Sequence, residues 1–94
     1  MKIAYNKQKD IQLQAERGIS FRCFIDKIKN GEILDDIKNP NYSRYPDQKI
    51  FIIELDNYAY LVPYVESNME IFLKTAYPSR KMTKKYLGDS KNET

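Results

Sequence analysis

The stretch KIFIIELDNYAYLVPYV, residues 49–65, decides the fold of this chain. Its first part, Lys49 to Leu55, is an apolar run rich in Ile and Phe, which is typical of a central strand covered on both faces. Asp56 and Asn57 then predict a tight turn into a second strand over residues 58–65. Because Pro63 has no N–H to donate, this second strand is expected to be an edge strand or to be bulged there. The stretch therefore predicts an antiparallel hairpin within a β-sheet.

Two helices are predicted before this hairpin. Residues 7–17 contain good helix formers, and Gly18 can supply the left-handed residue that ends such a helix. Ser20 is the expected N-cap of a second helix, which stops at Asn30-Gly31. This second helix has the clearest amphipathic stripe in the chain. The apolar positions of the stripe are Phe21, Phe24, Ile25 and Ile28.

The remaining elements are predicted from shorter patterns. These patterns indicate an extended start and two further strands, over residues 3–5, 33–37 and 69–77 respectively. Ser79 is the expected N-cap of a terminal helix that ends before Gly88, with Met82 and Tyr86 as its apolar contacts. The predicted fold class is α+β, with two N-terminal helices, an antiparallel sheet of three or four strands, helices on one face, and a short basic C-terminal helix.

Length and composition favour one small domain. Ninety-four residues suffice for a single core, so we expect one domain over residues 1–88 and a frayed tail over residues 89–94. Cys23 is the only thiol and cannot form an internal disulfide, which favours a reducing compartment. Its position beside the amphipathic stripe favours packing over chemistry. Because the apolar runs are far shorter than the roughly 20 residues of a membrane span, we expect a cytoplasmic protein with no membrane partner.

The positive charge is concentrated at the end of the chain. Residues 1–73 carry 10 Lys and Arg against 11 Asp and Glu, whereas residues 74–94 carry 6 against 2. A local basic cluster of this kind is a candidate surface for binding phosphate groups. The alternative is a solvated helix face that only keeps the chain soluble.

Several kinds of chemistry are excluded by composition. The chain has no His and one Cys, so a Ser-His-Asp triad, an imidazole metal site and a thiolate zinc site are all ruled out. Three isolated Gly residues cannot form a phosphate-binding loop or a dinucleotide fingerprint. The acidic pairs Asp35-Asp36 and Glu54/Asp56 are better explained as a loop and a turn than as a metal site. We therefore expect no metal and no cofactor.

Lys, Arg, Tyr and carboxylates remain, and these can cleave RNA. Attack by the neighbouring 2′-OH needs a base for its proton, cations for the crowded phosphate and a donor for the leaving 5′ oxygen. Arg binds phosphate through two donors, a Lys amine among other cations can act as base, and Tyr can donate a proton or stack on a nucleobase. Residues 74–86 contain the Lys, Arg and Tyr of this inventory, with Arg80 and Lys84, and likewise Lys81 and Lys85, on common helix faces.

Three short segments and their order resemble toxins of the BrnT family. Tyr5-Asn6 followed by Lys9 corresponds to the family's Trp-Asp…Lys opening. The Arg17-Gly18-Ile19-Ser20-Phe21 junction corresponds to its His-Gly-Val-Ser-Phe, and Ser79-Arg80-Lys81-Met82-Thr83 to its Ala-Arg-Lys-Ala-Thr helix start. The likeness spans roughly residues 3–87. It implies a RelE-like fold, metal-independent endoribonuclease activity and growth arrest.

The resemblance also implies partners. They are an RNA substrate and a cognate antitoxin of the ribbon-helix-helix class, with DNA bound only through the toxin–antitoxin complex. Two positions depart from the family pattern. Arg17 stands where the family has His and can hold a phosphate but not act as a base, and Lys74 is only the nearest counterpart of a basic residue late in the last strand.

The leading hypothesis assigns the cleavage chemistry to Lys9, Arg80 and Lys81. The expected RNA-binding residues are Arg17, Lys74, Thr83, Lys84, Lys85 and Tyr86. Two alternatives stay open: a non-catalytic nucleic-acid-binding module that uses the same basic patch, and an interaction protein with an exposed Tyr-rich sheet. The tyrosines of the strands are expected to be mostly packing residues, with at most one or two of them functional, and Tyr86 can be a packing residue as well. These strand tyrosines are Tyr5, Tyr58, Tyr60, Tyr64 and Tyr77.

Overall fold

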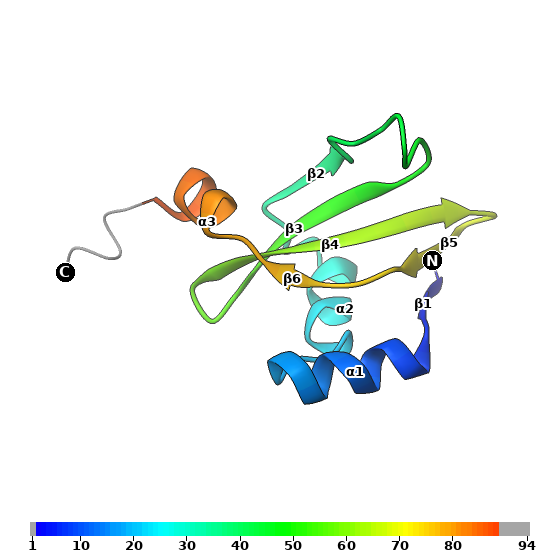
Figure 1. Cartoon of the computed structure of the whole chain (residues 1–94), viewed down its shortest axis with the longest axis horizontal. Helices are drawn as coiled ribbons and strands as arrows, with labels where there is room; N and C mark the ends of the chain where they lie inside the picture. Colours follow the sequence, from blue (N-terminus) through cyan, green and yellow to red (C-terminus); the bar gives the residue numbers. More distant parts are fainter. Residues whose placement is uncertain (1, 89–94) are drawn as a thin grey trace.

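A computed structural model describes residues 2–88 and has an α+β fold, in which three helices pack on a mixed six-stranded sheet (Figure 1). The elements are β1 Lys2–Tyr5, α1 Lys7–Arg17, α2 Arg22–Lys29, β2 Asp35–Lys38, β3 Lys49–Leu55, β4 Tyr58–Ser67, β5 Glu70–Leu73, β6 Tyr77–Pro78 and α3 Arg80–Leu87. The tail predicted over residues 89–94 lies outside the described residues. The broad fold class is therefore confirmed.

The end of α1 is as predicted, but the start of α2 differs from the prediction. Gly18 ends α1 in the left-handed conformation, with φ at 67°, as expected. Ser20 is not the N-cap of α2, which begins after Phe21 without a side-chain cap. The Phe21 N–H instead donates to the Asp10 carboxylate at 2.8 Å. The start of α2 is thus held by a side chain of α1 through the Phe21 N–H, and the Ser20 side chain does not cap the helix.

The predicted hairpin forms the centre of the sheet. β3 and β4 pair in antiparallel fashion from Lys49 opposite Tyr64 to Leu55 opposite Tyr58. Asp56 and Asn57 have φ values of 55° and 66°, the left-handed geometry that two-residue hairpin turns adopt. The strand order is β1-β5-β4-β3-β2, with β6 also paired to β4. The sequence analysis therefore predicted the β3–β4 hairpin correctly.

The prediction was wrong about the size and direction of the sheet. It has six strands, and β1 pairs with β5 in parallel, so the sheet is mixed. The last strand, predicted over residues 69–77, is broken into β5 and β6. β4 is an interior strand, and the break lies opposite Pro63, whose carbonyl accepts the Lys74 N–H at 2.8 Å. Since Pro63 cannot donate, the partner segment is irregular beside it.

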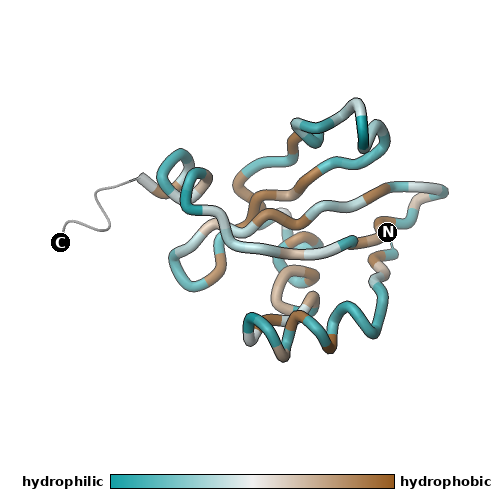
Figure 2. The backbone as a smooth tube through the Cα atoms, viewed as in Figure 1, coloured by the Kyte–Doolittle hydropathy of each residue, from teal (hydrophilic) through white to brown (hydrophobic). Residues whose placement is uncertain are grey.

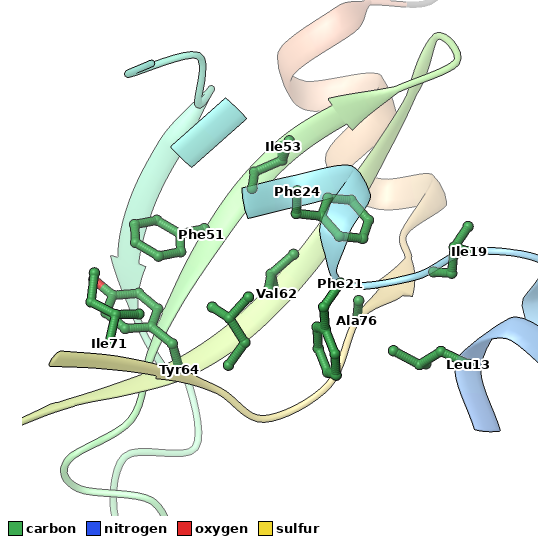
Figure 3. Close-up of a cluster of buried hydrophobic side chains, with 11 residues drawn as sticks. Leu13, Ile19, Phe21, Phe24, Phe51, Ile53, Val62, Tyr64, Ile71 and Ala76 are labelled. Atoms are coloured by element: carbon green, nitrogen blue, oxygen red, sulfur yellow. The ribbon is translucent and has the colours of Figure 1, made fainter. Parts of the chain in front are cut away.

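One face of the sheet holds the main core, which α1 and α2 cover (Figures 1 and 3). The apolar segments concentrate in the central strands, whereas α3 and the loop between β2 and β3 are mainly hydrophilic (Figure 2). The core residues are Leu13, Ile19, Phe21, Phe24, Phe51, Ile53, Val62, Tyr64, Ile71, Leu73 and Ala76. Cys23, expected to pack beside this core, is exposed.

α3 lies on the opposite face, so the expectation that all helices cover one face is wrong. Ile50 and Ile52 alternate with the core residues of β3 and are also buried. Asp35 is the register partner of Ile52, so the two side chains project from the same face. The Tyr86 hydroxyl of α3 donates to this Asp35 carboxylate, which places α3 on that face. We call it the α3 face.

Asp35 and Asp36 lie on β2, which agrees with the strand predicted over residues 33–37 and corrects the assignment of this acidic pair to a loop. Asp36 projects from the core face, where its carboxylate accepts the Tyr64 hydroxyl at 2.7 Å. The interaction-protein alternative assumed a sheet with exposed tyrosines, but the tyrosines of the strands are buried or half-buried.

Among residues 2–88, no helix has the length and apolar character needed to cross a membrane.

Candidate nucleic-acid interface

α3 is held to the sheet by its own cap and by one buried hydroxyl. Ser79 is the N-cap, as predicted, and its Oγ accepts the Met82 N–H at 3.1 Å. The Thr83 hydroxyl accepts the Ala59 N–H of β4 and donates to the Ser79 carbonyl, both at 2.8 Å. Gly88 follows the helix, and its N–H donates to the Lys84 carbonyl. The cations of α3 are therefore presented from a fixed helix.

The outer surface of α3 carries four exposed cations. They are Arg80, Lys81, Lys84 and Lys85. None of them forms a salt bridge with any residue of the described range, where the ion pairs are Lys2–Glu70 and Lys49–Asp36. Like charges spaced i, i+4 disfavour an isolated helix by a few tenths of a kcal/mol each. A multivalent anion bound here would relieve that repulsion.

A hollow of about 350 Å³ lies between α3 and the turn of the β3–β4 hairpin. Its lining residues are Asn57, Tyr58, Arg80, Thr83 and Lys84. We call it the α3 hollow. Arg80 and Lys84 bring two positive charges to it, and no carboxylate is among these lining residues. The hollow therefore offers a planar guanidinium, an ammonium and a phenol to one ligand, a set suited to a phosphate group.

Tyr86 is engaged on the other side of α3, away from this lining. Its hydroxyl donates to Asp35 Oδ2 at 2.5 Å, and this hydrogen bond raises the pKa of Tyr86 above its ordinary value. The same bond, with the Asp36 N–H, lowers the pKa of the Asp35 carboxyl, and Lys85 contributes in the same direction. The Tyr86 hydroxyl therefore serves to attach α3 to β2, and its proton is committed to Asp35.

The structure gathers some of the predicted site residues and separates others. Arg80, Thr83 and Lys84 line the α3 hollow, whereas Lys81 and Lys85 are exposed beside it. The Thr83 hydroxyl is used in two backbone hydrogen bonds, so its observed contacts are structural. The sequence analysis did not assign Asn57 or Tyr58 to the binding site, because only folding brings this turn against α3.

Lys9 and Arg17 lie on α1, which covers the core face of the sheet. The sheet therefore separates them from the cations of α3 (Figure 1). Lys74, the remaining predicted RNA-binding residue, lines a second hollow between the β2–β3 loop and β4. The fold thus does not bring Lys9 to Arg80.

Comparison with models of protein families, with curated proteins and with solved structures finds no match for this chain.

Proposed function

We propose that this chain is a RelE-like endoribonuclease of the BrnT kind, the toxin of a type II toxin–antitoxin system, which cleaves cytoplasmic RNA without a metal. One observation carries this proposal: Arg80 and Lys84 line one hollow with Tyr58, free of salt bridges to the described residues. The chain has two helices, a sheet and a basic helix in the predicted order, and this supports the proposal at the level of the α+β class. The partner in this proposal is a ribbon-helix-helix antitoxin, through which the complex binds DNA.

The α3 hollow suits attack by a ribose 2′-OH on the adjacent phosphorus. Arg80 holds two non-bridging phosphate oxygens through its parallel donors and stabilises their growing negative charge. The Lys84 ammonium stabilises the negative charge on the attacking oxygen, and the 2′-OH proton passes to solvent water as the O2′–P bond forms. The Tyr58 hydroxyl then donates a proton to the 5′ oxygen as the P–O5′ bond breaks. The products are a 2′,3′-cyclic phosphate and a free 5′-hydroxyl, so no water or metal is consumed in this step.

The test is cleavage of single-stranded RNA by purified protein in excess EDTA. Arg80→Ala combined with Lys84→Ala should lower the rate by at least about 10²-fold, because each acid–base or charge-stabilising role contributes roughly 10²–10⁴. Arg22→Ala combined with Lys29→Ala removes the same charges from exposed positions of α2 and should leave the rate near that of wild type. Wild-type cleavage by the first variant would reject the assignment.

Lys81 is a sharper internal comparison. It is exposed on α3 but does not line the hollow, so Lys81→Ala should reduce cleavage less than Arg80→Ala does. Lys9→Ala should also have the smaller effect, because α1 lies across the sheet from α3.

A second candidate function is nucleic-acid binding without cleavage. The observation that favours it is the absence of a carboxylate among the lining residues of the hollow, which leaves no Asp or Glu to act as a general base. Such a module would bind RNA with log–log salt dependence of about −0.7 per phosphate contacted. It would leave the RNA intact in the same assay, which separates the two candidates.

A further inference from the structure

The loop between β2 and β3, residues 39–48, exposes aromatic rings to solvent. Tyr42 is 59% exposed and Tyr45 39% exposed. Within residues 2–88 the other exposed large apolar side chains are Ile11 and Met69, which lie on other elements. The aromatic exposure of the chain is thus concentrated in one loop, and loops on a rigid scaffold are where binding residues gather. We call residues 39–48 the tyrosine loop.

Each exposed ring has a cation beside it. Lys38 Nζ lies 5.0 Å from the centroid of the Tyr42 ring, and Arg44 Cζ lies 5.5 Å from that of Tyr45. Neither cation takes part in the salt bridges found among the described residues. Aromatic rings that stack nucleobases, flanked by cations that follow the phosphates, are the combination by which proteins bind single-stranded nucleic acid.

A hollow of about 280 Å³ adjoins one of these rings. It is lined by Tyr45, Pro46, Asp47, Gln48, Val65 and Lys74. Lys74 is exposed, and its Nζ lies 5.4 Å from the Phe72 ring. Asp47 would repel a phosphate, but together with Gln48 it offers the hydrogen-bond acceptor and donor that the edge of a nucleobase requires. The hollow therefore suits a base, with the phosphate on the side of Lys74.

Hydrogen bonds hold the tyrosine loop in shape without a ligand. The Asn39 N–H donates to the Gln48 carbonyl at 3.1 Å, and Asn39 Nδ2 donates to Gln48 Oε1 at 2.7 Å, which closes the loop at its base. The Tyr45 N–H donates to the Asn41 carbonyl at 2.9 Å. Since the backbone that carries the rings is already ordered, less conformational entropy is lost when a ligand binds.

The hollow beside Tyr45 and the α3 hollow border the same face of the sheet, whereas Lys38, two positions after the core-facing Asp36, projects from the core face. Val65, which lines the hollow of the loop, alternates with the core-facing Tyr64, so it projects from the α3 face. In Figure 1 the loop between β2 and β3 and the helix α3 lie toward opposite ends of that face. A single extended strand can therefore contact both hollows and reach Lys38 and Tyr42 by passing around the end of the sheet.

We propose that the tyrosine loop is a base-binding subsite for single-stranded RNA. Tyr42 and Tyr45 stack nucleobases, while Lys38, Arg44 and Lys74 hold the neighbouring phosphates. The choice of RNA rests on the function proposed above. The subsite selects single-stranded substrate, because the bases of a duplex are stacked on one another and cannot lie on the two rings.

The test measures fluorescence anisotropy of a short, labelled, single-stranded 2′-O-methyl oligoribonucleotide, which cannot be cut by 2′-OH attack. Tyr42→Ala combined with Tyr45→Ala should weaken binding at least about tenfold, the loss expected when base–aromatic stacking is removed. Tyr42→Phe combined with Tyr45→Phe keeps both rings and should bind within about threefold of wild type. Ile11→Ala combined with Met69→Ala removes the other exposed apolar side chains of the described range and should change nothing.

The salt dependence of oligonucleotide binding separates the contribution of base stacking from that of the charges. Lys74→Ala should reduce the log–log salt slope by about 0.7, whereas the Tyr-to-Ala pair should leave the slope unchanged. Unchanged affinity of the Tyr-to-Ala pair would overturn the subsite, as would a wild-type protein that fails to bind the oligonucleotide. An equal loss on duplex RNA would also overturn it. Failure of the proposed nuclease is distinct, because it appears as intact RNA in the cleavage assay whatever the oligonucleotide affinity.

Discussion

The Thr83 hydroxyl makes two hydrogen bonds at 2.8 Å, accepting the Ala59 N–H and donating to the Ser79 carbonyl. Thr83 itself is 7% exposed, and Ala59 is fully buried. At the scale of single residues, this position shows how a motif can combine two kinds of role. Arg80 of the same motif lines the α3 hollow with an exposed charge, whereas the observed contacts of the Thr83 hydroxyl fix the helix to the sheet.

Thr83→Val should destabilise the fold by about 1–3 kcal/mol, because the buried Ala59 N–H loses its partner while the shape of the side chain is retained. Urea denaturation measures this loss through the midpoint at constant slope. Thr83→Ser keeps the hydroxyl and should retain most of the stability. Equal stability of the Val variant and wild type would mean that this hydrogen bond does not hold α3 in place.

At the scale of elements, α3 is joined to β2 by the hydrogen bond between Tyr86 and Asp35. The bond lowers the pKa of Asp35 from 3.8 and raises that of Tyr86 from 10.0. A lowered carboxyl pKa contributes stability that is present above pH 3.8 and is lost as the pH falls through the folded value. A raised phenol pKa contributes stability that is present below pH 10.0 and is lost as the pH rises through the folded value.

Tyr86→Phe should therefore lower the melting temperature most between these limits, and the difference from wild type should shrink below pH 3.8 and above pH 10.0. Thermal melts followed by circular dichroism over this pH range provide the measurement. Tyr77→Phe is the matched control, since the hydroxyl of Tyr77 takes part in no hydrogen bond within the described chain and its loss should give no such pH dependence. A pH-independent difference for Tyr86→Phe would contradict the attachment of α3 through this bond.

The elements that could be predicted from sequence are those set by local signals. Gly18 ends α1 and Ser79 caps α3 because caps depend on residues a few positions apart. The Asp56-Asn57 turn fixes the register of β3 and β4 in the same local way. The hydrogen bond from the Phe21 N–H at the start of α2 was missed because its acceptor, Asp10, lies 11 residues away in another helix. The parallel pairing of β1 with β5 was missed for the same reason, because it joins residues 2–5 to residues 70–73.

At the scale of the whole molecule, the sheet divides the predicted site. Lys9 and Arg17 lie with α1 over the core face, and Arg80 and Lys84 lie with α3 on the other. The sequence located the basic helix but gave no information on which face each helix covers, because that depends on the order of the strands. The tyrosine loop was also missed, although Tyr42 and Tyr45 in a loop with Arg44 were a visible signal.

The measurement that tests the central claim most directly is the location of bound RNA on the folded protein. The uncleavable single-stranded 2′-O-methyl oligoribonucleotide can be titrated into ¹⁵N-labelled protein while each amide resonance is followed. Binding in the α3 hollow should shift the amides of residues 56–58 and 80–85 most strongly, at low salt and in EDTA. Shifts confined to residues 7–29 of α1 and α2, or no shifts at all, would contradict the account.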